Sequence, residues 1–209
     1  MKIKLLLYIA LLVCLNACEK NYEMHISSNS MLPTYKKGST VKVTRINKTT
    51  SNDYLCRGCL VVYTRKSSSG ETNLYLHRVI AIQNDTFEYN STDDNFTVNN
   101  KKTEKNLTEK FETNAEGVKK INLLSIEKID SKKYSVQSEE NFNLIQTASA
   151  MVGDLQSQQY PLLTDKDCKI LTQTMKCKVP LNYVFVIGDN RANSLLGFVP
   201  IANIVGYIE

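Results

Sequence analysis

Short segments of β-forming residues, spaced along the whole chain, constrain its fold more than any other feature of the sequence. Valine, isoleucine, threonine and tyrosine alternate with polar residues or form short apolar runs, a pattern typical of strands. No long stretch has an apolar period of 3.6 residues, and we expect only a short helix, around 149–156. We therefore predict a mostly β protein, with strands at 40–46, 60–63, 74–82, 96–98, 134–136 and 183–187.

Changes in composition divide the chain into parts. The first eighteen residues are basic and then apolar, whereas Asn, Thr, Lys and Glu prevail between Asn84 and Lys178 and the strand signals there are weaker. A chain of 209 residues is long enough for one substantial domain with an inserted lobe. We predict a core made of 19–83 and 179–209, with the inserted lobe at 84–178.

The charge pattern argues against a nucleic-acid partner. The formal net charge is +5, but the lysines are interspersed with acidic residues and asparagines, as in 101–105. Mixed charges of this kind are typical of a solvated surface rather than of a basic binding patch.

The N-terminus has the pattern of an export signal. Lys2 and Lys4 precede an apolar run of eleven residues, 5–15, which is too short for a membrane span of about 20 residues and fits a signal-peptide core. The run ends at Leu15-Asn16-Ala17-Cys18, which resembles a lipoprotein processing box in which Cys18 would be acylated; a short uncleaved anchor is the alternative. Either way, residues 1–18 would tether the chain to a membrane, with the rest on the extracytoplasmic side.

The cysteines of the exported part form two close pairs. An even number of cysteines in an exported chain favours disulfides, and we predict one between Cys168 and Cys177, which would close a short loop. Cys56 and Cys59 leave three interpretations open: a disulfide, a redox dithiol, or half of a zinc site. Because the sequence has no second Cys-x-x-Cys and only two histidines, we expect no metal.

A serine pair near the start of the exported part is a candidate nucleophile. If Ser28 and Ser30 lie on an extended segment, both hydroxyls point to one face, so that one could attack a substrate while the other polarises it. Pro33 fixes its own φ and disfavours a helical Leu32, which predicts an extended chain just after Ser30. The alternative is an ordinary serine-rich turn, since Ser and Pro are common in turns.

A serine hydroxyl is a poor nucleophile until a base takes its proton. His77, within the β-rich segment 74–80, is the candidate base, because a histidine is mostly neutral near pH 7 without further tuning. The alternative for His77 is a strand histidine bonded to a backbone carbonyl, and His25, just upstream of the serines, is a competing base. With the reference pKa of about 6.5, activity should fall below that pH.

Three segments together resemble the type I signal peptidases, the membrane-bound serine proteases that remove signal peptides. They are the serine box 27–34, the base segment that contains His77 and Arg78, and the run 179–194, which includes Gly188-Asp189-Asn190-Arg191-Ala192-Asn193-Ser194. They occur in the family's order. A histidine followed by arginine matches the endoplasmic-reticulum and archaeal branch, whereas the motif from Gly188 to Ser194 matches the bacterial members.

The resemblance implies a role for each matching residue. Ser30 would be the nucleophile, Ser28 and the Ser30 amide the oxyanion donors, and His77 the general base. Arg78 would support the site. Asp189 and Asn190 would shape it, Arg191 would brace the loop, and Ser194 would hydrogen-bond the base to orient it.

The sequence departs from the family pattern at two places. Cys59 stands where the family usually has aspartate after glycine, and Leu195-Leu196 leads directly to Gly197, where the family has a further Asp-Ser-Arg. Both changes leave open a catalytically inactive relative that binds exported segments. The resemblance covers 24–45, 57–85 and 179–206, with a weaker likeness at 96–101 and 126–136.

By resemblance, we expect an antiparallel β-sheet catalytic core with an inserted second β lobe. The expected activity is that of a serine endopeptidase, tethered in a bacterial cell membrane, with no cofactor. Its partners would be signal peptides, bound as an added strand with alanine-like residues before the cut, and membrane lipid. A specialised peptidase for one conjugation or pilus substrate is the alternative within this class.

Overall fold

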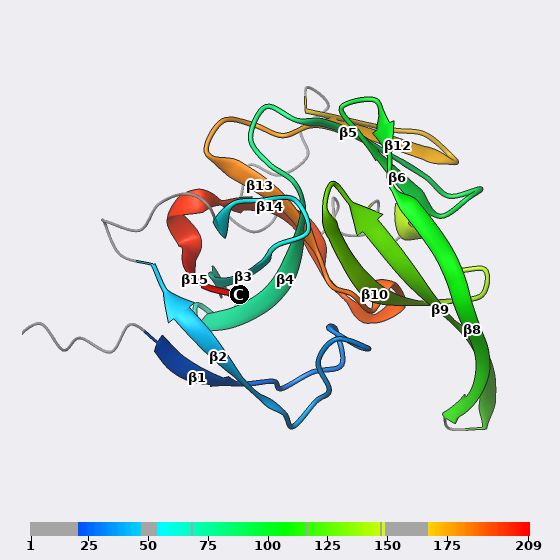
Figure 1. Cartoon of the computed structure of the whole chain (residues 1–209), viewed down its shortest axis with the longest axis horizontal. Helices are drawn as coiled ribbons and strands as arrows, with labels where there is room; N and C mark the ends of the chain where they lie inside the picture. Colours follow the sequence, from blue (N-terminus) through cyan, green and yellow to red (C-terminus); the bar gives the residue numbers. More distant parts are fainter. Residues whose placement is uncertain (1–20, 47–53, 68, 116, 147, 149–166) are drawn as a thin grey trace, which may run out of the picture.

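The computed structural model describes residues 21–46, 54–67, 69–115, 117–146, 148 and 167–209. Within these residues the chain folds into three antiparallel sheets, which confirms the prediction of a mostly β protein (Figure 1). The helix expected around 149–156 lies outside the described residues. The described helical elements include a short helical segment at 144–146 and the 3-10 turns η2 (Arg191–Asn193) and η3 (Ile201–Asn203).

The largest sheet has seven strands, drawn from both ends of the sequence. Its spatial order is β1 (Asn21–His25), β2 (Thr40–Arg45), β15 (Ile204–Ile208), β3 (Leu60–Lys66), β4 (Thr72–Ala81), β13 (Tyr183–Ile187) and β14 (Leu196–Pro200).

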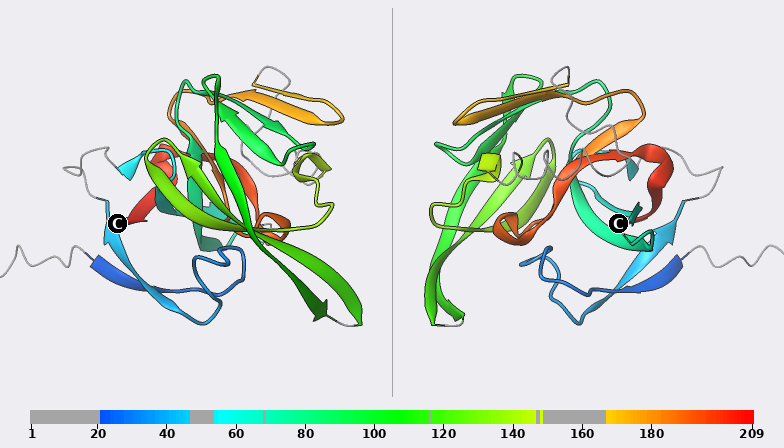
Figure 2. Two further views of the ribbon diagram at one scale, coloured as in Figure 1. Left: turned by 45° about the vertical axis from the view of Figure 1, so that its right-hand side comes forward. Right: turned by 180° about the vertical axis from the view of Figure 1, so that it is seen from behind.

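The middle of the chain forms the other two sheets. One has the order β11 (Cys168–Ile170), β12 (Thr174–Lys178), β5 (Thr86–Asn90), β6 (Asn95–Val98) and β7 (Lys101–Lys102). The other consists of β10 (Lys132–Glu139), β9 (Val118–Ile129) and β8 (Glu104–Ala115), and the β8–β9 hairpin extends beyond the other strands (Figures 1 and 2). The proposed domain limits at 19–83, 84–178 and 179–209 stay a prediction.

Alternation along β3 separates two parts of the core. Val61 and Tyr63 pack into a cluster with residues of β4, β13 and β14, whereas Leu60 and Val62 pack on the opposite face with residues of β2 and the serine segment. This is the expected result of side chains that point alternately to the two faces of a strand. Both faces of the central sheet are therefore buried around β3.

A third and larger cluster joins the sheets to one another. Phe87 of β5 packs against Phe185 of β13 with ring centroids 4.3 Å apart, and Phe198 of β14 lies next to both rings. Aromatic rings bury large apolar areas, so this contact fixes the five-stranded sheet on the end of the seven-stranded one.

The chain contains both disulfides that the sequence allowed. Cys168 pairs with Cys177, which lies directly opposite it in the β11–β12 ladder, as predicted. Cys56 is bonded to Cys59, so this pair forms a disulfide rather than half of a zinc site. Among the described residues, no group of three or more His, Cys, Asp and Glu side chains is arranged to hold a metal ion.

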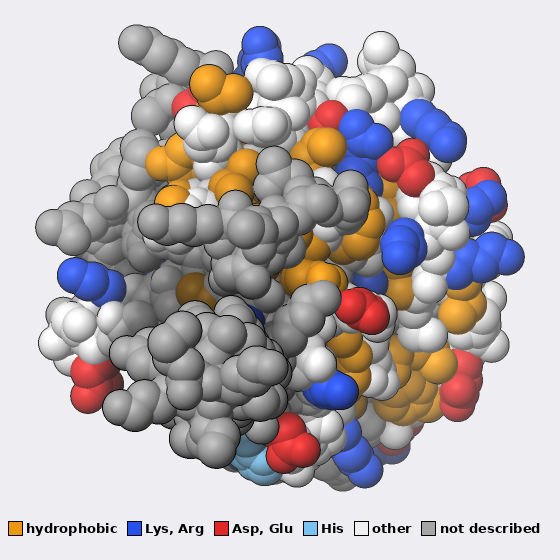
Figure 3. All heavy atoms as spheres, turned by 60° about the vertical axis from the view of Figure 1, so that its left-hand side comes forward, with side chains coloured by type: hydrophobic (Ala, Val, Ile, Leu, Met, Phe, Trp, Pro, Cys, Tyr) orange, Lys and Arg blue, Asp and Glu red, His pale blue; other side chains and the backbone are white. Residues whose placement is uncertain are grey.

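Surface charges are mixed, as the sequence pattern predicts. On the face seen in Figure 3, Lys and Arg side chains are interspersed with Asp and Glu. Exposed ion pairs within the three-stranded sheet include Lys120 with Glu139 and Lys128 with Glu104.

Candidate active site

A groove of about 580 Å³ runs between β1 and the first half of β4. Ser28, Ser30 and His77 all line it, together with Tyr22, Met24 and Leu76 among others. Two strand edges border the groove. Among the strands that the structure describes, β1 pairs only with β2, and β4 pairs with β13 only from Arg78 onward.

The serine box forms a turn, which corrects the expectation of an extended segment. Leu32 N–H donates to Asn29 C=O at 3.2 Å, and Tyr35 N–H donates to Met31 C=O at 2.8 Å, so the chain after Ser30 folds back on itself. Ser and Pro favour turns, and here that preference outweighs the extending effect of Pro33 on its neighbour.

The two serine hydroxyls are nevertheless side by side in this turn. Ser28 Oγ lies 3.0 Å from Ser30 Oγ, and the Ser30 N–H donates to Ser28 Oγ at 3.4 Å. Ser28 is exposed and Ser30 is half-buried. The amide and both hydroxyls are thus gathered at one place in the groove.

The turn is attached to the loop between β13 and β14. The Asn190 N–H donates to Ser30 C=O at 3.0 Å, and the Asn190 side-chain amide donates to Asn29 C=O at 3.1 Å. Thr34 Oγ1 donates a short hydrogen bond to Asp189. Asp189 and Asn190 therefore hold the serine segment in place.

His77 is almost fully buried, with 2% of its surface exposed. Its Nδ1 lies 2.8 Å from Tyr63 Oη, and its Nε2 lies 3.4 Å from Ser194 Oγ. Burial, and secondarily the charge of Arg65, lowers the pKa of His77 to about 3. The imidazole therefore stays neutral far below pH 6.5. The pH below which activity should fall, expected near 6.5 from the reference pKa, is lowered accordingly.

Gly188 lies where the serine segment and the base meet. No hydrogen bond joins Ser30 to His77, both of which are described residues. A Cβ atom on Gly188 would lie 2.2 Å from Ser194 Oγ and 2.4 Å from the backbone oxygen of Ser30. The absence of a side chain at Gly188 thus allows Ser194, which contacts His77, to lie beside the Ser30 backbone.

Ser194 is itself held in place by the backbone. Its Oγ accepts the Gly188 N–H at 2.7 Å and donates to Leu195 C=O at 2.8 Å. The hydroxyl next to His77 Nε2 consequently has a defined position.

Arg78 and Asp189 form a buried, two-pronged ion pair. Arg78 Nε and Nη2 donate to the two Asp189 oxygens at 2.7 and 2.6 Å, and its Nη1 donates to Gly58 C=O at 2.7 Å. The guanidinium also lies 4.0 Å from the centre of the Tyr134 ring. This pair connects β4, one residue after the base, to the loop that holds the serine turn.

Arg191 forms a second buried ion pair, which binds the same loop to the three-stranded sheet. Its Nη2 donates to Glu127 of β9 at 2.8 Å, and Glu127 also accepts the Tyr134 hydroxyl at 3.0 Å. Among the described residues, Arg191 Nε is a buried polar atom without a hydrogen-bond partner.

The loop closed by Cys56 and Cys59 supports Arg78 from the other side. Arg57 donates to both Asp85 oxygens at 2.7 Å and to Asp130 at 2.9 Å. Gly58 has φ +81°, and a Cβ there would lie only 2.6 Å from Lys132 Cβ, so glycine is required by both conformation and space. Cys59, which stands where the family usually has aspartate, is thus part of a disulfide.

Sequence reasoning missed several residues that complete the site. Tyr63 had a detectable signal, since it lies in a predicted strand next to the one that carries His77. Thr34 and Glu127 had none, because their partners Asp189 and Arg191 are 155 and 64 residues away.

The family model of signal peptidase, peptidase S26, matches residues 1–209. The chain belongs to this family. A search of the curated proteins finds no match.

Membership of the signal peptidase family makes this chain a serine peptidase of the class that acts on proteins bearing signal peptides. Members are typically associated with membranes. In this S26 peptidase, none of the helices among the described residues is long and apolar enough to cross a membrane. The expected anchor at 1–18 and the lipidation candidate Cys18 lie outside the described residues.

Proposed function

We propose that the chain is a membrane-tethered serine endopeptidase that removes signal peptides from exported preproteins, with Ser30 as nucleophile and His77 as general base. The observation that carries the proposal is the groove itself. It brings Ser28, Ser30 and His77 to one surface, beside two strand edges, in a chain of the signal peptidase family.

In the proposed first step, Ser30 Oγ attacks the scissile carbonyl carbon while His77 Nε2 takes the hydroxyl proton. His77 then gives this proton to the leaving amine, and water repeats the sequence to release the acyl group. The lowered pKa of His77 means that the imidazole starts neutral, and also that it is a weaker base than a free histidine until substrate binds. Ser30 Oγ must turn from Ser28 Oγ, its present partner at 3.0 Å, toward Nε2 when substrate binds.

The proposed oxyanion donors are the Ser30 amide and the Ser28 hydroxyl. They lie close together in the turn, with the amide directed at Ser28 Oγ at 3.4 Å. A substrate carbonyl oxygen placed between them would accept from both. Donors of this kind contribute roughly 3–4 kcal/mol to transition-state stabilisation.

The substrate would bind as an extended strand between β1 and the first half of β4. Residues 73–77 have no strand paired on their outer side among the described residues, and the edge of β1 that faces away from β2 is likewise unpaired. A peptide in this position can hydrogen-bond to either edge while its side chains enter the groove. Small residues such as alanine are expected just before the cut and two residues further back.

The experiment that tests the proposal is cleavage of a preprotein with an Ala-x-Ala site by the full chain in detergent. Ser30→Ala and His77→Ala should each lose at least about 1,000-fold in kcat/KM. Ser91→Ala, a serine in the five-stranded lobe, is the control for serine removal. If His25→Ala abolished cleavage and His77→Ala did not, His25 would be the base. Cleavage by Ser30→Ala at the normal rate would refute the nucleophile.

We also propose that residues 1–18 tether the peptidase and that its groove faces the extracytoplasmic side. The support is the basic start, the short apolar run and the box that ends in Cys18. Acylation of Cys18 would add a fatty-acyl mass, measurable by mass spectrometry of the intact protein, and Cys18→Ser should lack it. Retention of residues 1–17 on the mature chain would instead support the uncleaved anchor.

A further inference from the structure

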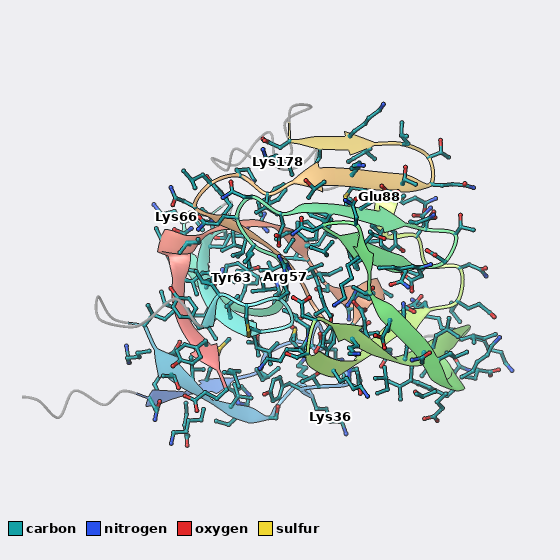
Figure 4. All side chains as sticks on the ribbon, turned by 45° about the horizontal axis from the view of Figure 1, so that its top comes forward. Lys36, Arg57, Tyr63, Lys66, Glu88 and Lys178 are labelled. Carbon is teal, nitrogen blue, oxygen red and sulfur yellow. A yellow bond between two sulfur atoms is a disulfide. The ribbon has the colours of Figure 1, made fainter. Side chains whose placement is uncertain are left out.

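The buried face of His77 contacts a tyrosine of the neighbouring strand. Tyr63 Oη lies 2.8 Å from His77 Nδ1, and the two ring centroids are 5.8 Å apart. In the β3–β4 ladder, Tyr63 pairs with Tyr75 and Val61 pairs with His77. Tyr63 and His77 are therefore diagonal neighbours on one face, and strand register sets their contact. Figure 4 shows Tyr63 in the interior of the seven-stranded sheet.

A catalytic base normally has a third group that orients it. In Ser-His-Asp sites a carboxylate bonds the histidine nitrogen that faces away from the serine. Here Asp189 is bonded by Arg78 and by Thr34. Within the described part of the chain, the hydrogen-bond partners of His77 are Tyr63 and Ser194 alone.

We infer that Tyr63 is the positioning residue for His77: its oxygen would accept a hydrogen bond from Nδ1–H and leave the Nε2 lone pair toward Ser30. The single Ser194 proton, which points to Leu195 C=O at 2.8 Å, would then turn to Nε2 at 3.4 Å. The inference rests on the proposed Ser30–His77 mechanism. A neutral imidazole carries one N–H, and the partner of one nitrogen decides the state of the other. If Tyr63 donated to Nδ1 instead, the proton would sit on Nε2 and His77 would have no lone pair on the serine side.

A phenol suits this position for an electrostatic reason. Tyr63 is itself buried, with 4% of its surface exposed, and Tyr75 packs beside both rings. A carboxylate at this place would stabilise the imidazolium, whereas a neutral hydroxyl orients the ring without adding charge. Tyr63 therefore fixes the direction of the base and leaves it neutral before substrate binds.

The test is Tyr63→Phe in the full chain in detergent, which removes the hydroxyl and keeps the ring. The chain has only two histidines, so the nitrogen-15 spectrum of labelled imidazoles is simple, and His77→Gln assigns the His77 signals. Wild type should show His77 protonated on Nδ1, and Tyr63→Phe should show a mixture or the Nε2–H form. The value of kcat for the Ala-x-Ala substrate should fall about 10- to 100-fold with KM unchanged within about twofold.

Tyr89→Phe is the matched control, because it removes the buried Tyr89 hydroxyl that donates to Asp94 at 2.7 Å in the other lobe. It should leave the His77 spectrum and kcat unchanged. An Nε2–H form in wild type, or an unchanged tautomer or kcat in Tyr63→Phe, would overturn the inference. Failure of the proposed function has a different signature, since wild type would then not cleave or Ser30→Ala would cleave at the wild-type rate, whereas the histidine spectrum is recorded without substrate.

Discussion

The two candidate reacting groups are held in different ways. His77 lies in β4, which is bonded to β3 at His77 and to β13 from Arg78 onward, and its ring is buried. Ser30 lies on a half-buried turn that depends on Asn190 and Asp189 for attachment. The base is thus placed by strand ladders and the nucleophile by a loop. The loop between β13 and β14 contacts both Ser30 and His77, so its residues determine how these two groups lie relative to each other.

Loss of the Asp189 carboxylate should have the largest effect, because it serves both regions. Asp189→Asn leaves the Arg78 charge buried without its anion, which should lower the free energy of unfolding by about 3–5 kcal/mol in urea titration. Lys119→Gln, which breaks an exposed pair with Glu112, should cost less than about 1 kcal/mol. A similar small loss in Asp189→Asn would mean that Arg78 has found another partner.

A methyl group at Gly188 should separate the nucleophile from the base. Because its Cβ would lie within 2.4 Å of both Ser194 Oγ and the Ser30 backbone oxygen, Gly188→Ala must displace one of them. Displacements of about 1 Å at a reacting group cost on the order of 100-fold in kcat, which steady-state cleavage would measure. Gly70→Ala is a control for stability alone, since Gly70 lies in an open turn with positive φ. Normal kcat in Gly188→Ala would show that the loop can adapt.

The burial of His77 predicts a pH-dependent stability that the serine turn should not share. Because the pKa of His77 is lowered to about 3 on folding, the unfolded chain takes up the proton first as pH falls below about 6.5. This contribution should lower the free energy of unfolding by about 1.4 kcal/mol per pH unit, or roughly 2.7 kcal/mol by pH 4.5. His77→Gln should flatten this part of the curve in denaturant titrations between pH 7 and 4.5. An equally steep curve for His77→Gln would assign the proton uptake to other groups.

Removal of the Thr34 hydroxyl should weaken the attachment of the serine turn without affecting the surroundings of His77. Thr34→Val keeps the shape of the side chain and deletes its hydrogen bond to Asp189, while Arg78 still bonds both carboxylate oxygens. We expect a loss of about 1–2 kcal/mol in thermal or urea unfolding, with the His77 imidazole spectrum unchanged. A shift of that spectrum would mean that the two regions are more tightly coupled than their separate anchors suggest.

Prediction from the sequence succeeded where the apolar signal was strong and failed where it was weak. The segment that became β2 alternates in part, whereas those that became β3, β4 and β13 carry short runs of buried residues. The two longest strands, β8 and β9, were missed because they are rich in Lys, Glu and Asn and largely exposed toward the hairpin end. Pairing with each other, rather than burial of one face, accounts for much of that hairpin.

The sequence by itself determined the β class, the family likeness, the Cys168–Cys177 pairing and the candidates Ser30 and His77, because these depend on local pattern and on motif order. The tertiary structure alone decided that the serine box is a turn, that Tyr63 contacts His77, and that Glu127 pairs with Arg191. It also decided that the pKa of His77 lies far from its reference value. Each of these depends on burial or on partners far apart in sequence, such as Arg78 and Asp189, which are 111 residues apart.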